Sequence, residues 1–390
     1  MNFELVDTPA AFRRAAAQLF HGRGPCAIDT ERASSFRYDD RAFLVQVNRR
    51  DAGTFLFAPE GHRDALREAL APVIGGTDWI LHAAGEDLPS LAELGLHPGT
   101  LFDTEIAARL AGFERPNLAA MVGEFTGVTL DNGYGREDWS TIPLPLQWQA
   151  YAADDVVYLS ALAEGLTEVL DAAGKLEAAE QEFEHVRTRP APAPKTWRDL
   201  KGISSLPTGR SLHLARALWD YRDARGRATD TSPHTLLGSK VILNIAKNPP
   251  RTPDELGRVR GFPARRRDAI EEWYAVIERA CADAPSRWPD APRDRDNPPS
   301  KSSWQRHHPE SWQRFVSARE EVSRHADDID VAPELLVQPA LLRAVVWNGV
   351  ASETGAAARA LSAAGARPWQ VDAASAAIAR GLRAADSEAT

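Results

Sequence analysis

The first 185 residues alternate short apolar segments with amphipathic ones. Four short segments are apolar and rich in β-branched or aromatic residues, which predicts β-strands: PCAIDT, RAFLVQVN, GTFLFA and DWILHA. Three further segments have the periodicity of amphipathic helices: HRDALREALAPVI, LPSLAELGL and TEIAARLAGF. A longer helical pattern runs from Pro145 to Leu176. This alternation predicts an α/β domain with a central sheet.

Two proline-rich segments divide the rest of the chain. The first, RTRPAPAPKTW, predicts a stiff, extended linker, and the second is APSRWPDAPRDRDNPPSKSS. The segments between and after them have helical patterns throughout. We therefore expect an α/β domain at residues 1–185, a linker at 186–203, a helical domain at 204–283, a linker at 284–303 and a further helical domain at 304–390.

The two helical regions contain a weak internal repeat. The segment RGRATDTSPHTLLGSKVILNIA resembles RHADDIDVAPELLVQPALLRAV, with one gap. Both run from a basic helix end through a short loop to a proline and a helix that contains two leucines. The repeat favours two related helical domains over one larger domain.

The charge is unevenly distributed along the chain. The net charge of -9 argues by itself against nucleic-acid binding. Residues 1–185, however, carry 14 basic and 30 acidic groups, a net of -16, whereas residues 186–283 carry 19 and 11, a net of +8. Residues 284–390 carry 13 basic and 14 acidic groups and are nearly neutral. This asymmetry suggests an acidic working domain beside a basic docking domain, although solvated surface charge without a role is the alternative for the basic segment.

Several classes of protein are disfavoured by composition. No apolar run approaches the roughly 20 residues of a membrane-spanning helix. The N-terminal segment MNFELVDTPAAFRR lacks the pattern of a signal peptide. The two cysteines, Cys26 and Cys281, are too few and too far apart for a zinc cluster or a disulfide framework. We expect a cytoplasmic protein with no membrane association.

Acidic residues recur where the predicted strands end and helices begin. Asp29 and Glu31 lie two apart in a strand, so their side chains point to the same face. Asp87 follows another strand at the start of a helix. Tyr151 and Asp155 lie four apart and share one face of a helix. We expect these side chains to converge at one edge of the sheet.

Clustered carboxylates of this kind indicate a metal site. With no matching basic residue nearby in sequence, they would repel one another and become protonated. A hard divalent cation resolves this conflict, and Mg²⁺ or Mn²⁺ suits a site made only of carboxylates. Two such ions about 4 Å apart can stabilise both the attacking and the leaving oxygen of a phosphoryl displacement. Each acid alone could instead be a surface charge or, for Asp87, a helix cap.

The three motifs, in this order, resemble those of the DEDD exonucleases. They are D-x-E at Asp29, H-x-x-x-x-D-L from His82 to Leu88, and Y-x-x-x-D from Tyr151. The tyrosine in the last motif makes it resemble the DEDDy branch of these exonucleases. The histidine branch carries His one residue earlier, where this chain has Ala150. The segments LFDTEIAARLAGF and EFTGVTLDNGYGREDWSTIPLPLQWQAYAADDVVYL resemble ribonuclease D. The basic helical segment resembles the HRDC domain that ribonuclease D shares with RecQ-type helicases.

The resemblance implies a fold and an activity. The fold is an α/β, ribonuclease H-like exonuclease domain with a mixed, mostly five-stranded sheet, followed by two all-α HRDC-like domains, the second degenerate. The activity is that of a 3′–5′ exoribonuclease that uses two divalent metal ions and releases nucleoside 5′-monophosphates. The expected partner is RNA, such as the 3′ ends of tRNA precursors or other structured RNA, and the expected state is a monomer.

The resemblance also implies a role for each acidic residue. Asp29 would bridge both metal ions. Glu31 and Asp155 would complete one metal site, and Asp87 would hold the other, partly through water. Tyr151 would orient the attacking water with its hydroxyl.

Two different functions stay open. The first is a 3′–5′ DNA exonuclease with the same chemistry, and the second is a catalytically silent RNA-binding scaffold. The HRDC units and the lack of a polymerase domain favour RNA over DNA. The intact set of acids argues against the scaffold, because an inactive protein need not keep mutually repelling carboxylates.

Basic residues outside the acidic cluster are candidate contacts to nucleic acid. The run Arg265, Arg266 and Arg267 is a candidate for binding phosphates, with a solvated helix start as the alternative. Many ribonuclease D relatives carry a lysine where this chain has Asn132, and Arg136 is predicted to supply that charge instead.

Four further polar or aromatic residues are predicted to be structural. We expect His82 to form a structural hydrogen bond, with a metal ligand as the alternative. We expect Asp103 to cap a helix or to support a metal ligand, with a direct ligand role as the alternative. Trp139 and Trp148 are predicted to be core or wall residues, with base-stacking platforms as the alternative.

Overall fold

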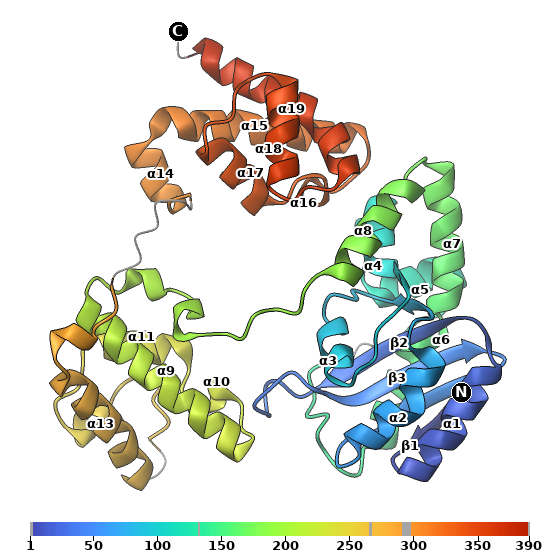
Figure 1. The fold of residues 1–390 in the computed structure, drawn as a ribbon, viewed down its shortest axis with the longest axis horizontal. Helices are drawn as coiled ribbons and strands as arrows, with labels where there is room; N and C mark the ends of the chain where they lie inside the picture. The colour runs from blue at the N-terminus through green and yellow to red at the C-terminus, as the bar shows by residue number, and fades with distance from the viewer. Residues whose placement is uncertain (1–2, 132, 265–266, 291–297, 389–390) are drawn as a thin grey trace.

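A six-stranded mixed sheet organises the N-terminal part of the computed structural model, which describes residues 3–131, 133–264, 267–290 and 298–388 (Figure 1). The strands are β1 (Phe3–Val6), β2 (Arg23–Arg32), β3 (Ala42–Arg50), β4 (Gly53–Phe57), β5 (Asp78–Leu81) and β6 (Thr100–Asp103). Their order is β1-β4-β3-β2-β5-β6. Strand β3 is antiparallel to β2 and β4, and the other pairs are parallel. The prediction of a mixed sheet is confirmed, and the sheet has six strands where mostly five were expected.

Helices cover both faces of this sheet. Helices α1 (Pro9–His21) and α2 (Arg63–Ile74) contact each other and pack on one face, where Phe12 and Leu70 are fully buried. Helix α3 (Leu88–Glu93) adds Leu91 to the same core. Helices α4 (Thr104–Leu110) and α5 (Leu118–Thr126) contribute to a second core.

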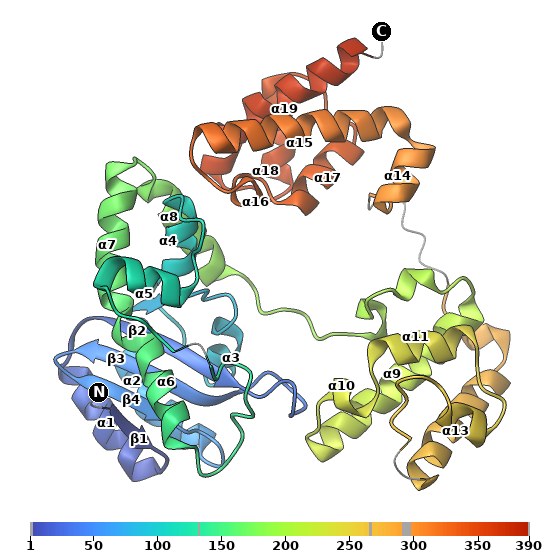
Figure 2. The same ribbon diagram turned by 180° about the vertical axis from the view of Figure 1, so that it is seen from behind.

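The long helix predicted from Pro145 to Leu176 is wrong, because the chain forms α6 (Leu146–Val157) and α7 (Leu159–Ala172) with a break at Tyr158. Helix α6 crosses strands β2, β3 and β4, whereas α7 contacts α4, α5 and α8 (Leu176–Thr188). The break therefore lets α6 lie against the strand that carries Asp29 and Glu31 while α7 extends the helical layer (Figure 2).

Two helical units follow the α/β part. The first contains η1 (Trp197–Asp199), η2 (Ile203–Ser205), α9 (Gly209–Thr229), α10 (Pro233–Leu236), α11 (Ser239–Lys247), α12 (Pro253–Gly257), α13 (Arg267–Ala282) and η3 (Pro285–Arg287). The second contains α14 (Lys301–His307), α15 (Pro309–Asp328), α16 (Pro333–Leu336), α17 (Pro339–Trp347), α18 (Thr354–Ala363) and α19 (Pro368–Glu388). The repeat is visible in the element order, since α9, α10 and α11 correspond to α15, α16 and α17.

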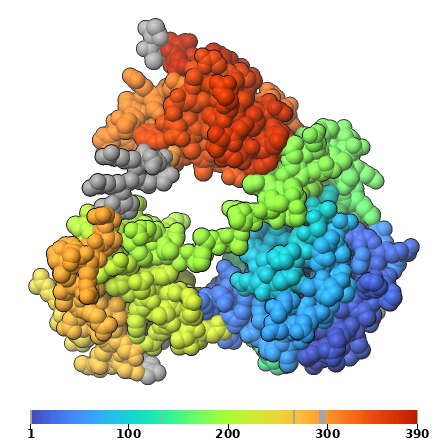
Figure 3. Space-filling view, viewed as in Figure 1, coloured from blue at the N-terminus to red at the C-terminus, as the bar shows by residue number. Residues whose placement is uncertain are grey.

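Both helical units contact the α/β part, and Figure 3 shows the three parts around an open centre. In the first unit, Asp230 accepts two hydrogen bonds from Arg41, at 3.0 and 2.7 Å. In the second unit, Arg367 donates to the buried carboxylate of Glu182 on α8, with Nε and Nη2 at 2.7 and 2.6 Å from its oxygens. The domain boundaries expected at 185, 203, 283 and 303 stay predictions.

The helices of the described ranges include none that is long and apolar enough to cross a membrane.

Candidate active site

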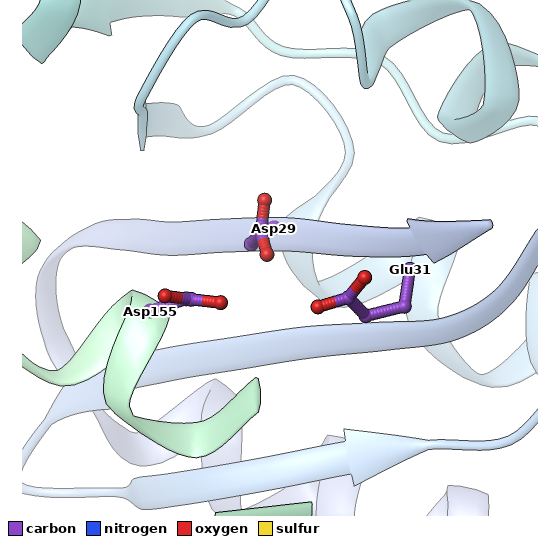
Figure 4. A group of neighbouring side chains, drawn as sticks. All are labelled: Asp29, Glu31 and Asp155. Carbon is purple, nitrogen blue, oxygen red and sulfur yellow. The ribbon is translucent and has the colours of Figure 1, made fainter. Parts of the chain in front are cut away.

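Three of the predicted acidic residues meet at one point of the sheet. Asp29 and Glu31 come from strand β2, and Asp155 comes from helix α6. One carboxylate oxygen of each lies within 4.8 Å of the others. Figure 4 shows the three carboxyl groups beside one another, two on the strand and one on the helix. The two-residue period of the strand and the crossing of α6 over β2 produce this convergence.

The three carboxylates line a cleft of about 520 Å³ to which Asp87 and Tyr151 also contribute. The Tyr151 hydroxyl lies close to Gly135, where an added Cβ would be only 3.3 Å from the hydroxyl oxygen. Burial, and then the Asp155 carboxylate, raise the pKa of Tyr151 above its ordinary value. Tyr151 therefore keeps its proton at neutral pH and offers the cleft a neutral hydroxyl.

Asp87 lies at the N-terminus of α3 but does not cap it with its side chain, so the alternative role of a helix cap is wrong. Its Oδ1 atom instead accepts a buried 2.6 Å hydrogen bond from Oγ1 of Thr30. Thr30 is the residue between Asp29 and Glu31, so its side chain leaves the strand on the opposite face. Strand β2 thus contributes two carboxylates directly and holds a third from its other face.

Burial and mutual repulsion make the metal-free carboxylates hard to ionise. Burial, and then the charge of Asp155, raise the pKa of Asp29 to about 8. Burial, and then the neighbouring Asp154, raise the pKa of Asp155 to about 7. The pKa values of Glu31 and Asp87 are raised by burial first and by Asp29 next. An all-oxygen donor set with this excess of negative charge fits a divalent cation such as Mg²⁺.

The expectation that no basic residue accompanies these acids is wrong. The guanidinium of Arg32 lies 4.0 Å from Oδ1 of Asp87 and 3.9 Å from Oε2 of Glu86. Its charge lowers the pKa values of Asp29, Glu31 and Asp87, but burial outweighs it at each. One cation at the edge of four carboxylates leaves the cleft strongly acidic.

Two supporting residues of the cleft were not predicted. Gln46 on β3 is fully buried opposite Asp29, and its Nε2 donates to Oδ2 of Asp29 at 3.4 Å. It is the only polar residue of the apolar run FLVQV, a signal that could have identified it. Thr30 carries no such signal, because its partner Asp87 lies 57 residues away.

The residues predicted to be structural have packing or hydrogen-bonding roles. Asp103 caps α4, accepting from the backbone nitrogens of Glu105 and Ile106, and the predicted cap is confirmed. His82 pairs through Nδ1 with Oγ1 of Thr104 at 2.9 Å, which confirms the predicted structural hydrogen bond. Trp139 is buried in a small core against which Trp148 packs, as predicted.

The described members of the predicted nucleic-acid contacts are not among the residues that line the cleft, although Arg136 directly follows Gly135, which is. Arg136 and Arg267 are exposed, and neither lines the cleft. Arg267 forms a helical ion pair with Glu271, with Nε and Oε1 at 3.3 Å. Arg265, Arg266 and Asn132 lie outside the residues that the structure describes. A contact between these basic residues and nucleic acid stays a prediction.

Comparisons with protein-family models cover all three parts of the chain. A 3′–5′ exonuclease model matches residues 3–171. An HRDC domain model matches residues 211–277. A model described as the 3′ to 5′ exonuclease C-terminal domain matches residues 297–382.

Curated relatives and solved structures extend these matches. The chain is 30% identical to ribonuclease D of Escherichia coli strain K12 over 301 residues, which covers 72% of this chain and 75% of that protein. It is 29% identical to ribonuclease D of Jannaschia sp. over 307 residues, 75% and 78% of the two chains. A crystal structure of a protein from Bifidobacterium adolescentis matches with a TM-score of 0.84 at 33% identity, over 97% of both chains. The fold of Escherichia coli RNase D matches with a TM-score of 0.73 at 22% identity, over 98% and 99%.

Proposed function

The chain belongs to the ribonuclease D family of 3′–5′ exoribonucleases, and on this premise we propose that its acidic cleft hydrolyses the 3′-terminal phosphodiester of RNA with two divalent metal ions. The products are nucleoside 5′-monophosphates. The convergence of the Asp29, Glu31 and Asp155 oxygens within 4.8 Å supports this proposal most directly. The raised carboxylate pKa values add to it, since a cation would relieve the repulsion that raises them.

The residues that would hold the ions are Asp29, Glu31, Asp87 and Asp155. Bound divalent ions would supply positive charge that acidifies the attacking water and stabilises the charge on the phosphate. Asp29 is positioned by the amide of Gln46, and Asp87 by the hydroxyl of Thr30. These two hydrogen bonds orient carboxylates that would otherwise rotate apart.

Tyr151 orients the attacking water in this proposal. Its raised pKa keeps the phenol neutral at neutral pH, so it acts as a hydrogen-bonding group and not as a phenolate base. The interaction between its hydroxyl and the Asp155 carboxylate fixes the direction of the hydroxyl. The water is thereby held beside the carboxylate cluster.

The substrate proposed is a structured RNA with a free 3′ end, such as a tRNA precursor. The basic segment 186–283 holds the RNA body, with Arg136 and the Arg265–Arg267 run among the phosphate contacts. The chain acts as a cytoplasmic monomer with Mg²⁺ or Mn²⁺. The DNA exonuclease alternative has less support, because the curated relatives described above are ribonucleases.

Degradation of end-labelled oligomers tests this function. RNA and DNA oligomers of one sequence are incubated with Mg²⁺, with Mn²⁺ and with chelator. We expect a ladder that shortens RNA from its 3′ end only when metal is present, and none with the Asp29→Asn variant. A ladder that persists in chelator, or one that starts at the 5′ end, would contradict the proposal.

A further inference from the structure

His82 lies beside the carboxylate cluster, at the point where strand β5 ends. Strands β2 and β5 are parallel, with Cys26 opposite Trp79 and Ala27 opposite Ile80. Two residues further along each strand, this register places His82 at the level of Asp29. His82 also lines the cleft that contains the carboxylates. Its imidazole is thus next to the place where the scissile phosphate would be held.

The hydrogen bonds of Thr104 determine which nitrogen of His82 carries the proton. Oγ1 of Thr104 donates to the carbonyl oxygen of Leu81 at 3.2 Å and lies 2.9 Å from Nδ1 of His82. A hydroxyl has one proton to give. Because that proton goes to Leu81, Oγ1 accepts from His82, and Nδ1 carries the proton. The opposite assignment would leave two oxygen lone pairs facing each other at 3.2 Å.

The other ring nitrogen is then a hydrogen-bond acceptor. Burial lowers the pKa of His82 to about 4, so the ring is neutral at neutral pH. A neutral imidazole protonated at Nδ1 has a lone pair at Nε2. In the part of the chain that the structure describes, Nε2 has no hydrogen-bond partner, and His82 is not in the group of three metal-binding carboxylates. The cleft therefore presents a neutral acceptor beside its charged ones.

The 3′-terminal nucleotide carries suitable donors close to its phosphate. Its ribose has a 2′-hydroxyl and a 3′-hydroxyl, which lie nearer to the scissile phosphate than the N–H groups of the base. The 2′-hydroxyl is the group by which a protein distinguishes RNA from DNA. A neutral acceptor can bind such a hydroxyl without the repulsion that a further carboxylate would impose on the phosphate.

We propose that His82 binds a ribose hydroxyl of the 3′-terminal nucleotide through Nε2, and that Thr104 is the positioning residue that makes Nε2 the acceptor. This inference rests on the proposed function. If the 2′-hydroxyl is bound, the contact selects RNA over DNA. If the 3′-hydroxyl is bound, the contact selects an unblocked end.

The test uses three oligomers that differ only in the terminal sugar: ribose, 2′-deoxyribose and 3′-deoxyribose. The kcat/KM for release of the terminal nucleotide is measured with Mg²⁺, and the Kd is measured in chelator. In the wild-type protein, we expect kcat/KM to be about 2- to 10-fold lower for one of the two deoxy oligomers than for the ribose oligomer. This is the usual range for one neutral hydrogen bond. The deoxy sugar that lowers kcat/KM identifies the hydroxyl that His82 binds.

Variants of His82 and Thr104 make the test specific. His82→Phe keeps an aromatic ring without the acceptor, so the preference between sugars should disappear. Thr104→Val removes the hydroxyl that selects the tautomer and should weaken the preference, whereas Thr104→Ser keeps the hydroxyl and should retain it. The ¹⁵N shifts of the His82 ring should report a proton on Nδ1 in the wild type and in Thr104→Ser.

Three outcomes would overturn the inference. The first is a wild-type enzyme with no preference for either hydroxyl. The second is an unchanged preference in His82→Phe. The third is a loss of Mg²⁺ affinity in that variant without a change in preference, which would make His82 a metal ligand. If the wild type releases nothing from any RNA, the proposed function fails instead, and the Kd values and ring shifts still decide the role of His82.

Discussion

Asp230 and Asp330 hold equivalent positions in the two helical units, and both contact the exonuclease part of the chain. Each follows a long helix and adopts a left-handed backbone, with φ of 46° and 54°. The carboxylate of Asp230 accepts two hydrogen bonds from Arg41. The carbonyl of Asp330 accepts from Nζ of Lys175 at 2.8 Å. Both helical units therefore contact the exonuclease domain through the turn that follows their long helix.

The contact at Asp230 can be removed without disturbing its backbone. Asp230→Gly keeps the left-handed conformation, which glycine adopts without strain, and deletes the carboxylate that Arg41 binds. Because this ion pair is partly exposed, the free energy of unfolding should change by less than about 1 kcal/mol. Amide hydrogen exchange in residues 33–41 should become faster. Asp330→Gly is the matched control and should leave that segment unchanged, and equal exchange in both variants would contradict the docking role.

Asp29→Asn should abolish nuclease activity and leave the fold intact. The substitution keeps the shape of the side chain but removes a charge from a cluster that needs several to hold metal ions. Without metal, the melting temperature should hold or rise, because one source of repulsion is gone. Asp155→Asn should behave in the same way, whereas its neighbour Asp154, which is outside the carboxylate group, supplies the control Asp154→Asn. Activity within about tenfold of wild type in Asp29→Asn would contradict the metal role.

Tyr151→Phe separates the tyrosine from the metal ligands. The ring keeps its place against Trp139, and only the hydroxyl is lost. Turnover should fall by roughly 10²-fold or more, the usual size of a positioned acid–base group, while metal affinity measured by calorimetry stays the same. Unchanged turnover would mean that Tyr151 is a packing residue.

Local patterns predicted most of the secondary structure and the direct members of the cleft. The spacing of Asp29 and Glu31 in a strand, and of Tyr151 and Asp155 in a helix, depends only on local geometry. The break at Tyr158 could not be predicted, because the apolar periodicity continues through it and the packing of α7 on α4 and α5 decides it. Strands β1 and β6 were not predicted, although neither is shorter than strand β5, which was.

The supporting contacts of the cleft were hidden for a different reason. In the cleft, Thr30 and Asp87 are joined by a hydrogen bond across 57 positions of the sequence. Outside the cleft, Glu182 and Arg367, which join helix α8 to the second helical unit, lie 185 positions apart. No local pattern identifies such partners. The role of Arg32 could not be predicted either, because its sequence position next to Glu31 says nothing about which acid its guanidinium meets.

The metal-free protein should become less stable as the pH rises from about 5 to about 8. The pKa values of Asp29 and Asp155, about 8 and about 7 in the folded state, are far above the ordinary value near 4. In this range, the folded protein keeps protons that the unfolded chain has already lost, so raising the pH favours unfolding. Melting temperatures in chelator should show the decline, and Mg²⁺ should reduce it. The double variant Asp29→Asn, Asp155→Asn should give a flatter profile, and an identical slope would contradict these shifts.

Binding of RNA should depend on the basic run Arg265, Arg266 and Arg267. Changing all three to Glu in the full chain should weaken the binding of a precursor tRNA in chelator. The slope of log Kd against the logarithm of the salt concentration should also become shallower, because fewer counterions are released. The slope should fall by roughly 0.7 to 0.9 for each phosphate that the variant no longer neutralises. Charge reversal is a cleaner test than ending the chain near residue 185, because such a chain lacks Arg367 and leaves buried Glu182 unpaired.

The control for this measurement reverses three arginines on the exonuclease part: Arg13, Arg14 and Arg67. These belong to helices α1 and α2, on the face of the sheet opposite the helices α6 and α7, and the reversal changes the net charge equally. If the basic segment binds the RNA body, the control should keep most of the wild-type salt slope while the Arg265–Arg267 variant loses part of it. Degradation of short single strands should survive in both, because the cleft needs only the 3′ end. Identical slopes in all three proteins would assign the helical units to contacts with protein.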